Sequence, residues 1–189
     1  MWNFKEDPDT HSILKDRATA DNHEDVRSAA IEVLAWNFKE DPDTHSILKD
    51  RATADNHEDV RSAAIRVLAS NFKEDPDTHS ILKDRATADD DQYVRGTAIQ
   101  VLAKNFKEDP DICSFLKDRA TADNDWYVRS AAIRALAKNF KEDPDTRLIL
   151  KDYATADNHE FVRSAAIVAL KILVVGFLQG RYLADGCFS

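Results

Sequence analysis

Glycine is scarce in this sequence, and its scarcity limits the folds that the chain can adopt. Only four of the 189 residues are glycine, and three of them lie at or beyond residue 176, which leaves Gly96 for the rest of the chain. Tight β-hairpins usually need glycine, because their turns require positive φ angles. We therefore expect no β-sheet, and turns built from capping Asp and Asn residues.

Cysteine is also rare. The two cysteines, Cys113 and Cys187, do not show the spacing of a disulfide framework, which favours a reduced, cytoplasmic setting. We expect no secretory signal, since Met1 leads directly into the first recurring motif. The apolar stretch of residues 165–178 is interrupted by a lysine and a glycine and is too short for a confident membrane span, so no membrane partner is expected.

The chain has no excess of basic residues. Lys and Arg number 26 against 35 Asp and Glu, which gives a formal net charge of −9. Binding to phosphate backbones calls for a basic stripe or patch. We therefore expect no nucleic-acid partner.

What the sequence does contain is one 34-residue motif present in five copies. The first two copies differ only at Glu32 against Arg66. A fixed period of this length indicates a repeat protein, in which each module packs on its neighbours. Five near-identical modules make an extended surface, whereas a catalytic centre needs a singular set of residues. The copies start at Trp2, Trp36, Ser70, Lys104 and Lys138.

Each copy is predicted to form two helices. In the first copy Asp7 precedes Pro8, a capping residue followed by a proline at the first helical position, and predicts a helix from Pro8 to about Ala20. Asp and Asn residues then break the pattern. Apolar residues at helical spacing predict a second helix from about His23 to Asn37.

The run DNHEDVRSAA at residues 21–30, which recurs with small changes in every copy, resembles HEAT repeats. More narrowly, it is similar to the short bacterial HEAT-like repeats of phycobilisome lyase subunits. The resemblance covers residues 2 to about 170 and implies an all-α, right-handed α-solenoid of five two-helix HEAT-like repeats, with the second helices on the concave side. Tetratricopeptide repeats share the period, but their glycine and Trp-Leu-Gly-Tyr signature is missing. We assign residues 1–171 to the array and residues 172–189 to an apolar C-terminal tail that caps the array or associates with another copy.

The resemblance also implies a structural ladder of Asp and Arg residues that joins successive repeats. An alternative is an arginine row that binds an anionic ligand, but a carboxylate supplied in register with every Arg favours the structural role. The ladder comprises an Asp and the Arg six residues later in each copy: Asp21 and Arg27, Asp55 and Arg61, Asp89 and Arg95, Asp123 and Arg129, and Asp157 and Arg163.

Differences among the copies concentrate on one face of the second helix. One position reads Asp25, Asp59, Tyr93, Tyr127 and Phe161, and the residue before it becomes Trp126 in the fourth copy. The position seven residues later reads Glu32, Arg66, Gln100, Arg134 and Val168, and this spacing places both on one face. In one interpretation, these positions differ among the copies because they are exposed and packing does not restrict them. In the other they form a protein-binding surface, since exposed aromatic residues suit binding hot spots. Its candidate residues are Tyr93, Trp126, Tyr127, Phe161, Arg66, Gln100 and Arg134.

Motifs for catalysis, cofactors and metals are missing. The chain has no phosphate-binding glycine loop and no nucleophile elbow. Histidines recur, as at His11, His45 and His79, but like residues are one repeat apart, roughly 10 Å by helix-packing distances. That distance is too large to share one metal ion with bonds of about 2 Å, so we interpret these histidines as solvated surface side chains. We expect no catalytic residue, no cofactor and no metal site.

These features predict a non-catalytic protein–protein interaction scaffold that is a fragment or module of a larger regulatory or sensor protein. The array begins in mid-motif, as if cut from a longer one. The expected partners are an unidentified protein and a second copy of the chain, bound through the tail to form a homodimer. Two alternatives are a bilin lyase or isomerase component, suggested by the resemblance, and a HEAT-like DNA glycosylase, which the acidic charge disfavours.

Overall fold

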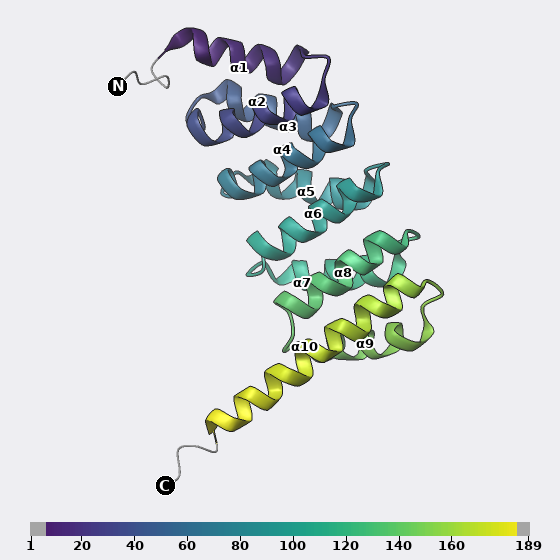
Figure 1. Ribbon diagram of the computed structural model, residues 1–189. Helices are drawn as coiled ribbons and strands as arrows, with labels where there is room; N and C mark the ends of the chain where they lie inside the picture. Colours follow the sequence, from purple (N-terminus) through teal and green to yellow (C-terminus); the bar gives the residue numbers. More distant parts are fainter. Residues whose placement is uncertain (1–6, 185–189) are drawn as a thin grey trace. The chain divides into compact units, whose positions relative to one another are not determined.

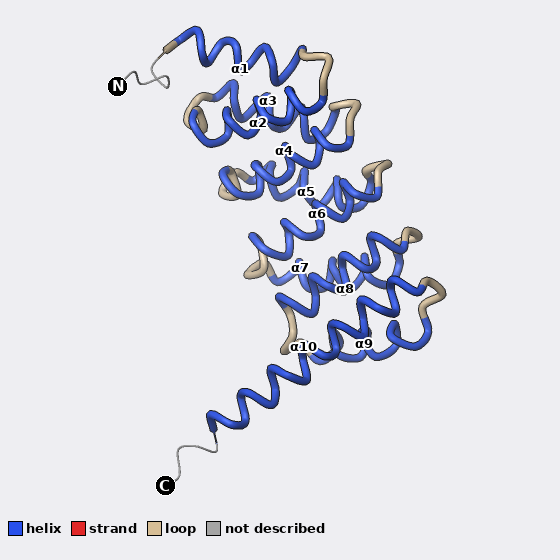
Figure 2. The backbone as a smooth tube through the Cα atoms, in the orientation of Figure 1, coloured by secondary structure: helices blue, strands red, loops and turns tan. Residues whose placement is uncertain are grey.

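The computed structural model describes residues 7–184, and for residues 174–184 it describes the helical backbone only. Over this range the chain forms helices joined by short turns and has no strand (Figures 1 and 2), so the predicted all-α repeat fold is confirmed. The helices are α1 (Pro8–Ala20), α2 (Glu24–Asn37), α3 (Pro42–Ala54), α4 (Glu58–Asn71), α5 (Pro76–Ala88), α6 (Gln92–Asn105), α7 (Pro110–Ala122), α8 (Trp126–Asn139), α9 (Pro144–Ala156) and α10 (Glu160–Ala184).

The helices fall into two compact units. Unit 1 spans Met1–Asn105 and contains α1 to α6, and unit 2 spans Phe106–Ser189 and contains α7 to α10. Within each unit a first helix packs against the second helix that follows it, and second helices pack against one another, as α4 does against α2 and α6. The first helices contact one another less closely. The second helices therefore form the more closely packed layer within each unit.

An N-capping aspartate followed by a proline sets the start of each first helix. In α3 the Asp41 carboxylate accepts a hydrogen bond from the backbone N–H of Asp43 at 2.7 Å, and Pro42 occupies the first helical position. Proline there costs no hydrogen bond, because the first N–H groups of a helix have no partner within it. Leu48 and Ala52 are fully buried on the side that faces α4, which sets the orientation of the helix.

The second helices are more deeply buried than the first. In α4, Val60, Ala64 and Leu68 have no exposed surface, because α4 packs between α2 and α6 as well as on the first helices. Small alanine side chains allow this close approach on two sides. By contrast Val26, the counterpart of Val60 in α2, is 39% exposed, since α2 has a described second helix on one side only. Among the residues whose side chains are described, no helix has the length and apolar character needed to span a bilayer.

Candidate functional site

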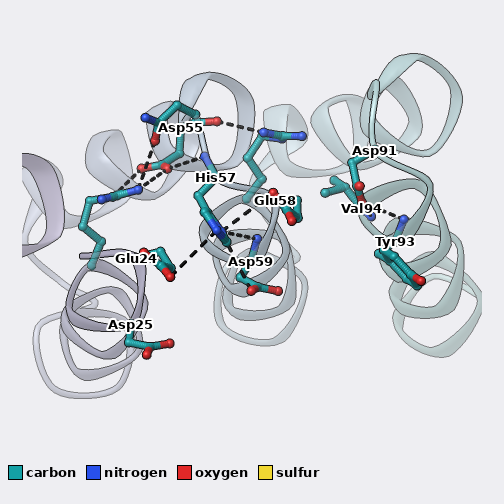
Figure 3. A network of polar contacts seen from close by, with 12 residues as sticks. Glu24, Asp25, Asp55, His57, Glu58, Asp59, Asp91, Tyr93 and Val94 are labelled. Atoms are coloured by element: carbon teal, nitrogen blue, oxygen red, sulfur yellow. Dashed lines mark hydrogen bonds and ion pairs between the residues drawn. The ribbon is translucent and has the colours of Figure 1, made fainter. Parts of the chain in front are cut away.

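The Arg–Asp ladder residues lie at the turns between first and second helices. Arg61 donates from Nε and Nη2 to the two carboxylate oxygens of Asp89, at 3.0 and 2.8 Å, and from Nη1 to the backbone carbonyl of Asp55 at 3.0 Å. Arg27 bonds to the Asp55 carboxylate and the Asp21 carbonyl in the same way, and part of this network is drawn in Figure 3. In unit 2, Arg129 repeats the arrangement with the Asp157 carboxylate and the Asp123 carbonyl.

This geometry differs from the pairing of each Asp with the Arg six residues later. That Arg donates a hydrogen bond to the backbone carbonyl of its own Asp. Within each unit, the carboxylates of Asp55, Asp89 and Asp157 accept hydrogen bonds from the Arg of the preceding copy. The physical reason is that the carboxylate also holds the turn: Asp55 accepts the backbone N–H of His57 at 3.0 Å. The same carbonyl contact is made by Arg95 to Asp89 and by Arg163 to Asp157.

Two ladder carboxylates, Asp55 and Asp89, are held ionised in spite of burial. Burial is the largest single influence on the Asp89 carboxyl and raises its pKa, but Arg61 and the backbone N–H of Asp91 together outweigh it, so the pKa of Asp89 is lowered. The same balance lowers the pKa of Asp55, through Arg27 and the N–H of His57. A carboxylate that accepts several hydrogen bonds is harder to protonate than one in water.

We expect the array to lose stability in acid because of these groups. A carboxyl whose pKa is lower in the folded chain contributes stability that is complete above its unfolded pKa of about 4 and is lost as the pH falls below that value towards the folded pKa. The urea midpoint should therefore fall as the pH is lowered from about 4. Asp89→Asn should already be destabilised at neutral pH and should show a shallower acid dependence than the unchanged chain. Parallel pH curves for the two proteins would contradict this account.

A second set of charge contacts joins the first helices, and it was not predicted from the sequence. Lys49 Nζ bonds to Asp75 at 3.3 Å and to Asp77 at 2.7 Å. The ring of His45 stacks on Phe72 at 4.6 Å, with Nε2 3.3 Å from Asp75. Burial, followed by the nearby Lys49 charge, lowers the pKa of His45. Equivalent contacts are made by Lys15 with Asp41 and Asp43, by His11 with Phe38 and Asp41, and by Lys117 with Asp143 and Asp145.

The interpretation of the recurring histidines as solvated side chains is therefore wrong for His11 and His45. Both are packed against the aromatic ring that ends the following second helix. The four-residue spacing between each histidine and the next lysine in the motif was the available signal, because it places both on one helix face.

In unit 1 the face of the second helices that varies among copies is mainly polar. Figure 3 shows Asp25, Asp59 and Tyr93 at equivalent positions on α2, α4 and α6. Tyr93 is 52% exposed, and its backbone N–H donates a hydrogen bond to the Asp91 carboxylate at 2.7 Å. The other two candidate residues of unit 1, Arg66 and Gln100, are exposed on α4 and α6.

In unit 2 the equivalent face carries an aromatic cluster of Trp126, Tyr127, His159 and Phe161. The ring of Trp126 stacks on His159 at 4.6 Å, lies 5.1 Å from Phe161, and meets Tyr127 edge-on at 5.9 Å. Helix caps place these side chains: Asp125 accepts the N–H of Tyr127 at 2.7 Å, and His159 Nδ1 accepts the N–H of Phe161 at 3.4 Å. His159 was not among the predicted site residues.

Beside this cluster, a groove of about 760 Å³ runs between α8 and α10. Apolar atoms form most of its wall, and Phe161, Val168 and Ile172, at seven- and four-residue spacing on α10, are each more than half exposed. Arg134, a predicted site residue, lies on α8 with Lys138, and Lys141 follows in the next turn. We refer to this feature as the α8/α10 groove. It is lined by Trp126, Tyr127, Arg134, Ala137, Lys138, Lys141, Phe161, Ser164, Ala165, Val168, Ala169 and Ile172.

The structure thus brings together Trp126, Tyr127, Phe161 and Arg134, whereas Tyr93, Arg66 and Gln100 belong to unit 1. Among the described residues, no group of three or more His, Cys, Asp or Glu side chains is placed to hold a metal ion. What the groove offers is apolar surface, stacked rings and cationic side chains, which suit binding of another molecule.

Comparison with known proteins defines the class. The family model for HEAT repeats matches residues 3–69 and 79–171, so the chain belongs to the HEAT-repeat family. In fold it is similar to the complex of CpcE and CpcF of phycocyanin lyase from Nostoc sp. PCC7120, with 22% sequence identity and a TM-score of 0.62 over 87% of this chain and 99% of that chain. No curated protein sequence matches the chain.

Proposed function

We propose that this HEAT-repeat chain is a non-catalytic scaffold that binds another protein through the α8/α10 groove. The supporting observation is the change of one repeated position from charged to aromatic. The positions that hold Glu58 and Asp59 on α4 hold Trp126 and Tyr127 on α8. The fold accepts the charged residues, so packing does not require the aromatic ones.

Exposed apolar side chains next to those rings support the same function. Phe161, Val168 and Ile172 are 55%, 56% and 55% exposed. Contiguous apolar surface of this kind on a charged protein commonly marks an interaction site. Aromatic and Arg side chains near the centre of such a surface contribute most of the binding free energy in many complexes.

A second candidate function is handling of a bilin. The α8/α10 groove combines apolar walls with cationic side chains, which also suits a planar molecule that bears carboxylates. The resemblance in fold to a phycocyanin lyase complex motivates a test by visible absorbance. A bilin spectrum that shifts with the unchanged chain, but not after substitution of Trp126 and Arg134, would favour this alternative.

Replacing Trp126 with Glu and Tyr127 with Asp is expected to abolish capture of the protein partner. The substitutions install the residues that the chain itself carries at Glu58 and Asp59, so helicity and the thermal midpoint should stay unchanged. The measurement is affinity capture from the source cell, followed by mass spectrometry and by circular dichroism of each variant.

The matched control is Trp36→Glu, which removes a tryptophan that is 68% exposed on α2 in unit 1. It should leave capture unchanged. A partner that is retained equally by the double variant would show that the aromatic cluster is not its binding site.

We further propose that the scaffold is cytoplasmic and is a module of a larger regulatory or sensor protein. We also propose that Tyr93, Arg66 and Gln100, which lie on unit 1, are protein-binding residues. Homodimerisation through the tail at residues 172–189 stays a prediction, because it depends on side chains from residue 174 onward, which lie outside the described residues.

A further inference from the structure

We propose that the α8/α10 groove binds an acidic amphipathic helix of the partner protein, oriented antiparallel to α8. This inference rests on the proposed recognition function and adds the chemistry and the direction of the bound segment. It draws on three observations, which are the length of the groove, the position of its cations and the direction of the helices that form it.

The length and lining of the groove suit a helix. Its lining residues extend along α8 from Trp126 to Lys138, which corresponds to about 18 Å at the rise of an α-helix, or roughly three turns, and Lys141 lies in the turn beyond. The apolar lining on α10 recurs at Phe161, Ala165, Val168 and Ile172, which is helical spacing. A partner helix with apolar residues at the matching spacing can place them along this length, as amphipathic helices do in other hydrophobic grooves.

The charges of the groove select an acidic segment. Arg134 and Lys138 are one helical turn apart and exposed, and within the described residues neither forms an ion pair with a carboxylate. Lys141 lies beyond them and is 3.9 Å from Glu142. The chain as a whole carries a net charge of −9, so a cationic end on an apolar groove is a local reversal of sign. Complementary charge of this kind favours acidic partners and disfavours basic ones.

The two ends of the groove differ, and this sets the direction. The aromatic cluster lies at the N-terminal ends of α8 and α10, and Lys138 and Lys141 lie at the C-terminal end of α8. Acidic side chains are most stable in the first turn of a helix, where they complement its dipole. A helix with acidic residues in its first turn and apolar residues afterwards therefore meets both ends when its N-terminus lies beside Lys138 and Lys141, antiparallel to α8.

The test uses three synthetic helical peptides of about four turns with the same Leu and Phe stripe. The first has Glu in its first turns, the second has the same Glu residues in its last turns, and the third has Lys in place of Glu. Trp126 reports binding in the full chain once Trp2 and Trp36 are replaced by Phe, since these are the three tryptophans of the sequence. Fluorescence of Trp126 and anisotropy of labelled peptides are measured at two salt concentrations.

The acidic-first peptide should bind most tightly, and Arg134→Glu with Lys138→Glu should weaken it by about tenfold or more. The matched control is Arg147→Glu with Lys151→Glu, an exposed pair with the same four-residue spacing on α9 and outside the groove lining, which should leave binding unchanged. Glu32 occupies the position of Arg134 in α2, so a glutamate at this repeat position is compatible with the fold.

Equal or tighter binding of the Lys peptide, or of a duplex DNA probe, would overturn the acidic occupant. Equal binding of the acidic-last peptide would overturn the orientation. If no peptide binds, yet partner capture still depends on Trp126 and Tyr127, the helix proposal fails and the recognition function stands. If capture is also independent of those residues, both fail.

Discussion

Arg61→Ala is expected to lower the free energy of unfolding of the chain by about 3 kcal/mol or more, the range seen when one partner of a buried ion pair is removed. The substitution removes both hydrogen bonds from the guanidinium to the Asp89 carboxylate and the one to the Asp55 carbonyl. The Asp89 side chain is only 1% exposed, so it cannot regain those bonds from water.

Arg66→Ala is the matched control, because Arg66 is an exposed arginine on the same helix. It should change stability by no more than about 0.5 kcal/mol. Arg61→Lys should lie nearer to Arg61→Ala, since an ammonium group cannot reproduce the bidentate contact. The measurement is the midpoint of chemical denaturation. Equal midpoints for Arg61→Ala and Arg66→Ala would remove the ladder from the account of stability.

Ile133→Ala is expected to cost about 2–5 kcal/mol, the range for truncation of a fully buried isoleucine. Ile133 has no exposed surface in α8, which packs between α7 and α10. Its counterpart one repeat later, Ile167, is 56% exposed on α10, and no described second helix follows α10. Ile167→Ala should therefore change stability by less than about 0.5 kcal/mol.

This pair compares one amino acid at one repeat position in two environments. Thermal and urea unfolding of both variants, monitored by far-UV circular dichroism, gives the two free-energy changes. A loss of stability at Ile167 as large as that at Ile133 would mean that Ile167 is covered in solution, by the tail or by a second copy of the chain.

Much of the secondary structure could be predicted from local chemistry. Proline after aspartate predicted the start of α1 at Pro8, and the Asp-Asn break predicted the turn before α2. These signals are local, because a cap acts on N–H groups only two or three residues away. The period then predicted repeated stacking, and the all-α repeat fold followed from it.

The candidate site was predicted only in part. Comparison of the copies with one another selected Trp126, Tyr127, Phe161 and Arg134, which the structure places at one groove. It did not select His159, because the first two copies also have a histidine at this position although they lack the aromatic residues. Comparison of the copies therefore gives no sign that this histidine belongs to the aromatic cluster. Only the packing of α10 beside α8 reveals that the His159 ring stacks on Trp126.

The sequence by itself determined the period, the helix boundaries and the residues that distinguish one copy from another, because these depend on neighbours along the chain. The tertiary structure decided which partner each charged group has. Arg27 takes the Asp55 carboxylate of the next copy, and Asp55 in turn holds the N–H of His57, since stacking brings residues 28 positions apart within 3 Å. It also decided burial: identical isoleucines differ in exposure because only one of them has a following helix packed over it.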